Sequence, residues 1–132
     1  MGRLGIRGKR AALTLFLALA ASGCGNALAA NPAVPKVRQD LTALREAMIK
    51  YVVSHGGQRP AQLTDLLTEN AKGERFFPGE TLPLDPWSEE YVYLPGSDDE
   101  LYDIVTYGQD GLAGGEAENA DLSLQMLREG RI

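Results

Sequence analysis

The sequence has few of the side chains on which small exported domains and small enzymes usually depend. It holds one cysteine, Cys24, and one histidine, His55, among its 132 residues. No disulfide framework can therefore hold the domain together, and Cys24 is expected either to carry lipid or to be removed with the export signal, which excludes a cysteine–histidine catalytic pair. A G-x-S-x-G motif, a phosphate-binding P-loop and zinc-ligand spacings are also missing. These absences predict that the protein is not an enzyme.

Acidic side chains are missing from the N-terminal part of the chain, where none precedes Asp40. The basic segment "MGRLGIRGKR" is followed there by the apolar run "AALTLFLALAAS". A basic, then apolar, then small-residue order is typical of a secretory signal peptide. A helix that spans a membrane needs about 20 apolar residues, so this run is short for a permanent anchor. The sequence therefore predicts an exported protein.

Two cleavage sites compete at the end of this signal. The segment "ASGC" resembles a lipobox that ends at Cys24, although Ala21 stands where bacterial lipoproteins usually carry leucine. The signal segment then spans residues 1–24 with the lipobox ending at Cys24, and the cysteine, lipidated and left as the mature N-terminus, attaches the protein to the membrane through a lipid anchor alone. Gly25 in the next position favours the periplasmic face of the outer membrane. The rival site is "ALA" at residues 27–29, which would give an unanchored periplasmic or secreted protein.

The remaining chain has a large excess of acidic over basic residues. The first ten residues hold four of the 13 Lys and Arg, which leaves 9 of them against 18 Asp and Glu. Such a surface repels nucleic acid and suits divalent cations, so we expect no nucleic-acid partner. A domain of this size without disulfides must be stabilised by its core or by a metal.

A helical period begins at Lys36 and predicts one long helix. Apolar residues recur at spacings of three and four, at Val37, Leu41, Leu44, Met48 and Tyr51/Val52. The segment "SHGG" ends this helix, because Gly56 or Gly57 can adopt the left-handed conformation of a helix cap. We interpret His55 as a capping residue at the helix C-terminus and not as a catalytic base.

The segments that follow predict an α+β domain in which the long N-terminal helix packs on a small antiparallel sheet. Residues 25–35 are expected to form a tether and residues 36–132 the globular domain. Within the latter we expect a second short helix in residues 59–70, a loop in residues 71–90, and strands in residues 91–94 and 101–106. Residues 122–132 could form a last short strand or a frayed helix. Phe76, Phe77 and Trp87 are the expected anchors of the loop on the core.

The stretch "YGQDGLAGGEAENADL", residues 107–122, combines four glycines with four carboxylates. Asp110 and Asp121, with Glu116 and Glu118 between them, offer only oxygen atoms, the ligands that hard cations prefer. The glycines allow sharp turns that point backbone carbonyls inward. From composition alone, a solvated acidic loop and a calcium site are both open.

The C-terminal half of the chain resembles the major pseudopilin of bacterial type II secretion, protein G. The similarity is carried by "DPW" at residues 85–87, Tyr91, "DI" at residues 103–104, and then Gly108, Asp110-Gly111, Gly114-Gly115 and Ala120-Asp121 in the same order. Upstream, "VRQDLTALREAMIKYVVSHGGQRP" is similar to the helix and corner that precede this region in the family. The resemblance implies a pseudopilin-like fold and a calcium ion bound in the acidic loop.

The resemblance also implies which residues bind that ion. Asp110 and Asp121 would supply carboxylates, and Tyr107 and Leu112 would supply backbone carbonyls. Ala120 stands where some family members have an acid, so Glu118, Asn119 or water would provide the remaining ligand.

The N-terminal segment differs from the family pattern, because it has neither the prepilin cleavage motif nor the long apolar helix of a filament subunit. We therefore expect an exported, calcium-stabilised, pseudopilin-like domain that is associated with type II secretion, with the pseudopilus or other secretion components as partners, and that does not polymerise as the major subunit does. The alternative is a periplasmic lipoprotein adaptor that uses the same fold outside any secretion system.

Overall fold

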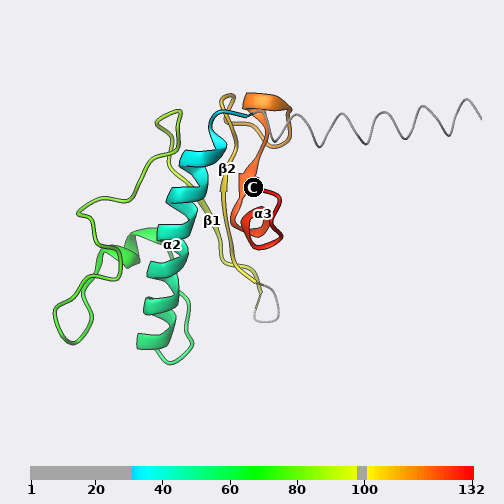
Figure 1. Ribbon diagram of the computed structural model, residues 1–132. Coiled ribbons are helices and arrows are strands. Elements are labelled where there is room, and N and C mark those ends of the chain that lie inside the picture. The colour runs from blue at the N-terminus through cyan, green and yellow to red at the C-terminus, as the bar shows by residue number, and fades with distance from the viewer. Residues whose placement is uncertain (1–30, 98–100) are drawn as a thin grey trace, which may run out of the picture.

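The computed structural model describes residues 31–97 and 101–132 (Figure 1). Its elements in chain order are helix α2 (Val34–Ser54), the 3₁₀ helix η1 (Leu63–Leu67), strands β1 (Val92–Leu94) and β2 (Asp103–Thr106), the 3₁₀ helix η2 (Ala117–Asn119), strand β3 (Leu122–Ser123) and helix α3 (Leu124–Arg128). One long helix and a small antiparallel sheet confirm the predicted α+β class. The expectations for the signal peptide, for Cys24 and for the cleavage sites lie outside the described residues.

Helix α2 forms where the apolar period predicts it, and its buried face includes Leu41, Leu44 and Met48. The helix begins at Val34, not at Lys36, since Pro35 fits the first turn of a helix, where no N–H donor is required. It ends at Ser54 and is capped by His55, whose N–H donates to the Tyr51 carbonyl at 3.0 Å.

The end of α2 confirms the predicted cap. The His55 ring stacks on the Tyr51 ring with 3.9 Å between centroids, so the histidine is engaged within its own helix. Gly56 and Gly57 follow with φ values of 65° and 96°, the left-handed conformation that ends many helices. The described part of the chain has no helix both long and apolar enough to cross a membrane.

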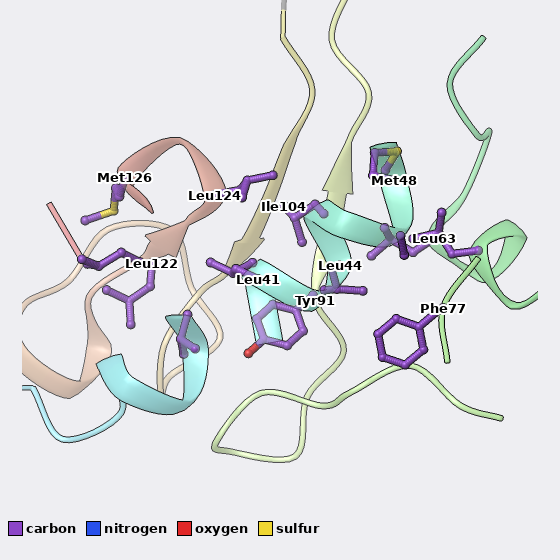
Figure 2. Packing of buried hydrophobic residues seen from close by; sticks show 14 residues of the cluster. Leu41, Leu44, Met48, Leu63, Phe77, Tyr91, Ile104, Leu122, Leu124 and Met126 are labelled. Atoms are coloured by element: carbon purple, nitrogen blue, oxygen red, sulfur yellow. The ribbon is translucent and has the colours of Figure 1, made fainter. Parts of the chain in front are cut away.

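The three strands are ordered β1-β2-β3, and both pairs are antiparallel. Tyr93 pairs with Ile104, and Thr106 pairs with Leu122. Because paired residues and alternate residues of a strand share one face of a sheet, all four lie on the face that α2 covers. Ile104 and Leu122 are fully buried against the leucines of α2 (Figure 2). Burying each such side chain contributes about 1.5–3 kcal/mol, which makes this interface the main apolar core.

The second helix is shorter than predicted. Instead of a helix in residues 59–70, the structure has a single 3₁₀ segment, Leu63–Leu67, between extended residues. The Oδ2 of Asp65 accepts hydrogen bonds from the N–H groups of Ala61 and Gln62 at 3.0 and 3.3 Å, as in a capping box, and this fixes where the segment begins. The segment ends early, because Thr68 returns to an extended conformation. The predicted apolar edge still packs inward, because Leu63 and Leu66 are buried.

The C-terminal segment contains both of the alternatives that its sequence allowed. Residues 122–123 pair with β2 as strand β3, and the chain then turns directly into α3. Ser123 makes this change possible, since its hydroxyl accepts from the Met126 N–H at 3.3 Å and caps the helix. Leu124 and Met126 lie in the core (Figure 2).

Two of the three expected aromatic anchors are confirmed. Phe77 is buried in the apolar cluster, and Phe76 is buried against the Tyr51 and His55 rings at the end of α2. Trp87 is only half-buried and lies outside the apolar cluster, so the prediction that it anchors the core is wrong. The physical reason is a tight turn in which the Ser88 N–H donates to the Asp85 carbonyl at 3.0 Å, which leaves Trp87 at the corner.

Candidate functional site

The acidic loop, residues 107–121, connects β2 to β3 and folds back on itself. Its Gln109 N–H donates to the Glu118 carbonyl at 2.9 Å, which joins the two sides of the loop. The Asn119 N–H donates to the Glu116 carbonyl at 3.0 Å and closes the turn at η2. The loop thus has a defined backbone path, although most of its side chains are exposed.

Two glycines allow this close backbone contact. Gly108 and Gly115 have φ values of 73° and 91°, and both lie against the backbone of Asn119. A Cβ at Gly108 would be 2.6 Å from the Asn119 carbonyl carbon, and one at Gly115 would be 2.5 Å from the Asn119 oxygen. Any side chain at either position would therefore force the loop apart.

A buried aspartate fixes the start of the loop. Asp85 is 4% exposed, and its Oδ1 accepts from the N–H groups of Trp87 and Glu89 at 2.9 and 2.8 Å. Its Oδ2 accepts from the Thr106 hydroxyl at 2.6 Å, and the Gly108 N–H donates to that same hydroxyl oxygen at 3.4 Å. Residue-by-residue reasoning missed this role. The signal for it was the Asp-Pro pair, because aspartate before proline favours a side-chain-stabilised turn.

Asp121 supplies the most informative atom of the loop. Its Oδ2 accepts from the Gly114 N–H at 2.9 Å, whereas its Oδ1 is buried and has no hydrogen-bond partner. A buried carboxylate oxygen without a donor is costly, so such an atom usually has a ligand or a role. This oxygen is therefore available to accept a hydrogen bond from water or to bind a cation.

The other predicted ligands lie in the same closed loop. Asp110 is exposed, and its Oδ1 accepts from the Leu112 N–H at 3.0 Å, which bends the chain at that point. Tyr107 is half-buried beside β2, and Leu112 is 67% exposed. The Glu118 side chain is exposed, and its backbone carbonyl already accepts from Gln109.

Side chains alone do not form a metal site in the described part of the chain. Among residues 31–97 and 101–132, no group of three or more His, Cys, Asp or Glu side chains is placed to hold a metal ion. A cation in the acidic loop would therefore depend on the carboxylates of Asp110 and Asp121 together with carbonyl oxygens. Mixed carboxylate and carbonyl ligation is the set that Ca²⁺ accepts and that zinc and other soft-ligand metals do not favour.

A second concave region offers no comparable chemistry. A hollow of about 690 Å³ lies between α2, η1 and residues 81–84. Its walls are mainly leucine and tyrosine side chains, among them Leu44, Leu82 and Tyr93, and Glu90 is the one carboxylate among the described residues that line it. No histidine, lysine or second carboxylate is among the described residues that line it, so the hollow shows no cluster of acid–base groups.

Comparison with known proteins identifies a consistent set of relatives. The profile of the family described as "Type II secretion system (T2SS), protein G" matches residues 27–125. The chain is 46% identical over 41 residues to the type II secretion system core protein G of Vibrio cholerae, a match that covers 31% of this chain and 28% of that protein. It is 28% identical over 72 residues to the core protein G of Xanthomonas campestris pv. campestris, where the match covers 52% of this chain and 50% of that protein. The matched stretch spans half or less of each of these relatives.

Proposed function

Because the chain belongs to the type II secretion system protein G family, we propose that it is a non-enzymatic, exported, pseudopilin-like domain that acts in type II secretion and is stabilised by Ca²⁺. The observation that carries the family assignment is the match over residues 27–125, which includes α2, the sheet and the whole acidic loop. The pseudopilus or other secretion components are the proposed partners. Genes for a secretion ATPase, a secretin or other pseudopilins beside this gene would support that association. Their absence would favour the lipoprotein adaptor instead.

The single observation that supports the calcium site is the buried, unpartnered Oδ1 of Asp121. Asp110 and Asp121 would hold the ion through their carboxylates, Tyr107 and Leu112 through backbone carbonyls, and Glu118 is the candidate for the remaining ligand. A bound cation supplies positive charge to a loop that otherwise gathers four carboxylates within 16 residues of sequence. The residues of the loop contribute by holding Asp121 and the backbone in place through the Gly114 and Gln109 amides.

Melting of the purified exported protein in calcium and in chelator tests this proposal. We expect an affinity on the order of 10⁻⁴–10⁻³ M, as in other extracellular calcium modules. A tenfold excess of Ca²⁺ over its dissociation constant then stabilises the folded state by about 1.4 kcal/mol. For a domain of this size, each kcal/mol raises the melting temperature by about 4–8 °C.

Two alanine variants make the test specific. Asp110→Ala removes a charged ligand without touching the core, so most of the calcium-dependent gain in melting temperature should be lost. Glu90→Ala removes an exposed acid outside the loop and should leave that gain intact. If EDTA lowers the melting temperature of neither the wild type nor Glu90→Ala, the loop is a solvated acidic loop and the calcium proposal is wrong.

We also propose that the protein is anchored through lipid on Cys24, on the basis of the "ASGC" segment after a short apolar run. Cells grown with a palmitate analogue should label the wild type and not Cys24→Ala, and the wild type should fractionate with the outer membrane. Equal labelling of the two proteins, or a mature form that begins at Ala30, would instead establish ordinary signal cleavage.

A further inference from the structure

Asn31 joins the start of the domain to the acidic loop, across 86 positions of sequence. Its side-chain Nδ2 donates to the backbone carbonyl of Ala117 at 2.8 Å, and its Oδ1 accepts from the Ala33 N–H at 3.0 Å. The residue is 4% exposed, so its amide is buried with both of its ends engaged. Figure 1 shows the cyan segment that leads into α2 beside the orange η2 of the loop.

The Ala117 carbonyl is held in place from the loop side as well. Ala117 has a φ of 52°, a left-handed conformation that is costly for any residue with a side chain. The Ala120 N–H donates to the same carbonyl at 3.2 Å, which makes it part of η2. The Asn31 amide is therefore hydrogen-bonded to η2, the segment of the loop that precedes Asp121.

The other end of the Asn31 side chain organises the first turn of α2. Its bond to the Ala33 N–H, together with the Val34 N–H bond to the Asn31 carbonyl at 3.2 Å, forms the turn that sets the helix direction. Ala33 is buried, and its carbonyl accepts from the Val37 N–H at 3.1 Å. The Asn31 side chain thus contacts both the turn that precedes α2 and the backbone of the acidic loop.

We propose that Asn31 is a latch that couples the conformation of the acidic loop to the start of α2, so that whatever orders one orders the other. This inference rests on the proposed function only where it takes Ca²⁺ as the ligand that orders the loop. Coupling of this kind is reciprocal: a cation that favours the closed loop also favours the turn at residues 31–34, and loss of that turn weakens cation binding by the same factor. The conformation of the turn at residues 31–34, which follows the predicted export signal and anchor, would thereby depend on whether the loop is ordered.

Asn31→Ser is the variant that separates the latch from helix capping. The serine hydroxyl can still accept from the Ala33 N–H, but it is too short to donate to the Ala117 carbonyl, and no charge is introduced. Asn70→Ser is the matched control, since the Asn70 Oδ1 also accepts from two backbone N–H groups, those of Lys72 and Glu74, in a turn remote in sequence from both α2 and the loop. Hydrogen exchange of the purified exported proteins, read by mass spectrometry with and without CaCl₂, is the measurement, and calorimetry gives the calcium affinity.

In the wild type and in Asn70→Ser, Ca²⁺ should slow exchange about fivefold both in the loop and at residues 33–37. In Asn31→Ser, the calcium affinity should fall about fivefold, and the calcium effect at residues 33–37 should vanish. If Ca²⁺ binds and protects the loop while exchange at residues 33–37 does not respond in the wild type, the latch is overturned.

A failure of the calcium proposal has a different result and still leaves the latch testable. If calorimetry detects no calcium binding to the wild type, amide hydrogen exchange measured without metal tests the latch. The Gln109 and Asn119 amides should then exchange about fivefold faster in Asn31→Ser than in the wild type. Equal exchange of these two amides in both proteins would overturn the latch independently of calcium.

Discussion

The interface between α2 and the sheet and the acidic loop show two ways in which one short chain can hold its shape. The interface is built from side chains that are almost completely buried, such as Leu41, Ile104 and Leu122, and it needs no polar contact (Figure 2). The loop buries almost none of its side chains and is held by backbone hydrogen bonds, two glycine contacts and the carboxylate of Asp121. The interface should accept apolar substitutions of similar volume but lose stability when a buried side chain is truncated. The loop depends instead on individual hydrogen bonds and glycines.

A third set of contacts links these regions. The Tyr91 hydroxyl donates to Oδ2 of Asp40 at 2.8 Å, and Lys36 donates both to that oxygen and to the Leu84 carbonyl. The residue after Leu84 is Asp85, which holds the start of the loop. Polar contacts thus run from α2 toward the loop, through the buried Tyr91–Asp40 bond and the exposed Lys36–Leu84 bond.

The largest effect is expected from the core. Leu41→Ala should lower the free energy of unfolding by about 2–5 kcal/mol, since the side chain is fully buried and leaves a cavity. Denaturant unfolding measures this loss, and Leu94→Ala, at a leucine that is 43% exposed, should cost less than about 0.5 kcal/mol. Calcium should stabilise Leu41→Ala as much as the wild type, because distant sites act additively. A lost calcium response would show that the two regions are not independent.

Tyr91→Phe comes next and tests the polar link. We expect a loss of about 1.5–3 kcal/mol near neutral pH, the usual contribution of a hydrogen bond to a charged group. Burial, and then the hydrogen bond to Asp40, raise the pKa of Tyr91 above its ordinary value. The folded protein therefore keeps this proton above pH about 10, where the unfolded chain releases it. Stability that is present below pH 10 is lost as the pH rises further, and this loss should be shallower in Tyr91→Phe. Equal slopes for the two proteins in alkaline unfolding experiments would contradict the assignment.

The smallest effect on global stability is expected from the loop, which can open while the core stays folded. Gly114→Ala and Gly115→Ala form a matched pair, because their φ values are 92° and 91°. A Cβ at Gly114 meets nothing within 4 Å. The free energy of unfolding of Gly114→Ala should therefore fall only by the cost of a left-handed backbone with a side chain, about 1–2 kcal/mol. Gly115→Ala adds the clash with the Asn119 backbone and should weaken calcium binding further. Calorimetry of the two proteins decides, and equal affinities would mean that the loop does not close as described.

The sequence was sufficient for features that depend on local periodicity. The 3.6-residue period predicted α2 and its buried leucines, and the β-branched and aromatic runs predicted β1 and β2, since neighbours along the chain determine both patterns. The family resemblance is confirmed by the match over residues 27–125, and the calcium ligands remain a prediction. The length of the second helix was harder to predict: the capping box at Gln62 and Asp65 begins only a 3₁₀ segment of five residues, Leu63–Leu67.

The distant partners of buried polar side chains could not be predicted, even where a local signal such as Asp85-Pro86 indicated a turn. The Asn31 bond to Ala117 and the Asp85 bond to Thr106 join residues 86 and 21 positions apart. Each involves a small polar side chain of a type that is usually solvated, and no period or spacing marks such a residue as buried. Their roles became visible only when the partner and the burial were known.

Asp121 also has a consequence for what it would cost the protein to bind an ion. Because the Gly114 amide already fixes one carboxylate oxygen, the side chain loses little rotational freedom when the other oxygen acquires a ligand. Preorganisation of this kind lowers the entropic cost of association and so raises the affinity. In the calcium proposal, the ordering that remains would fall on the backbone of the loop and on the turn at residues 31–34, and not on Asp121.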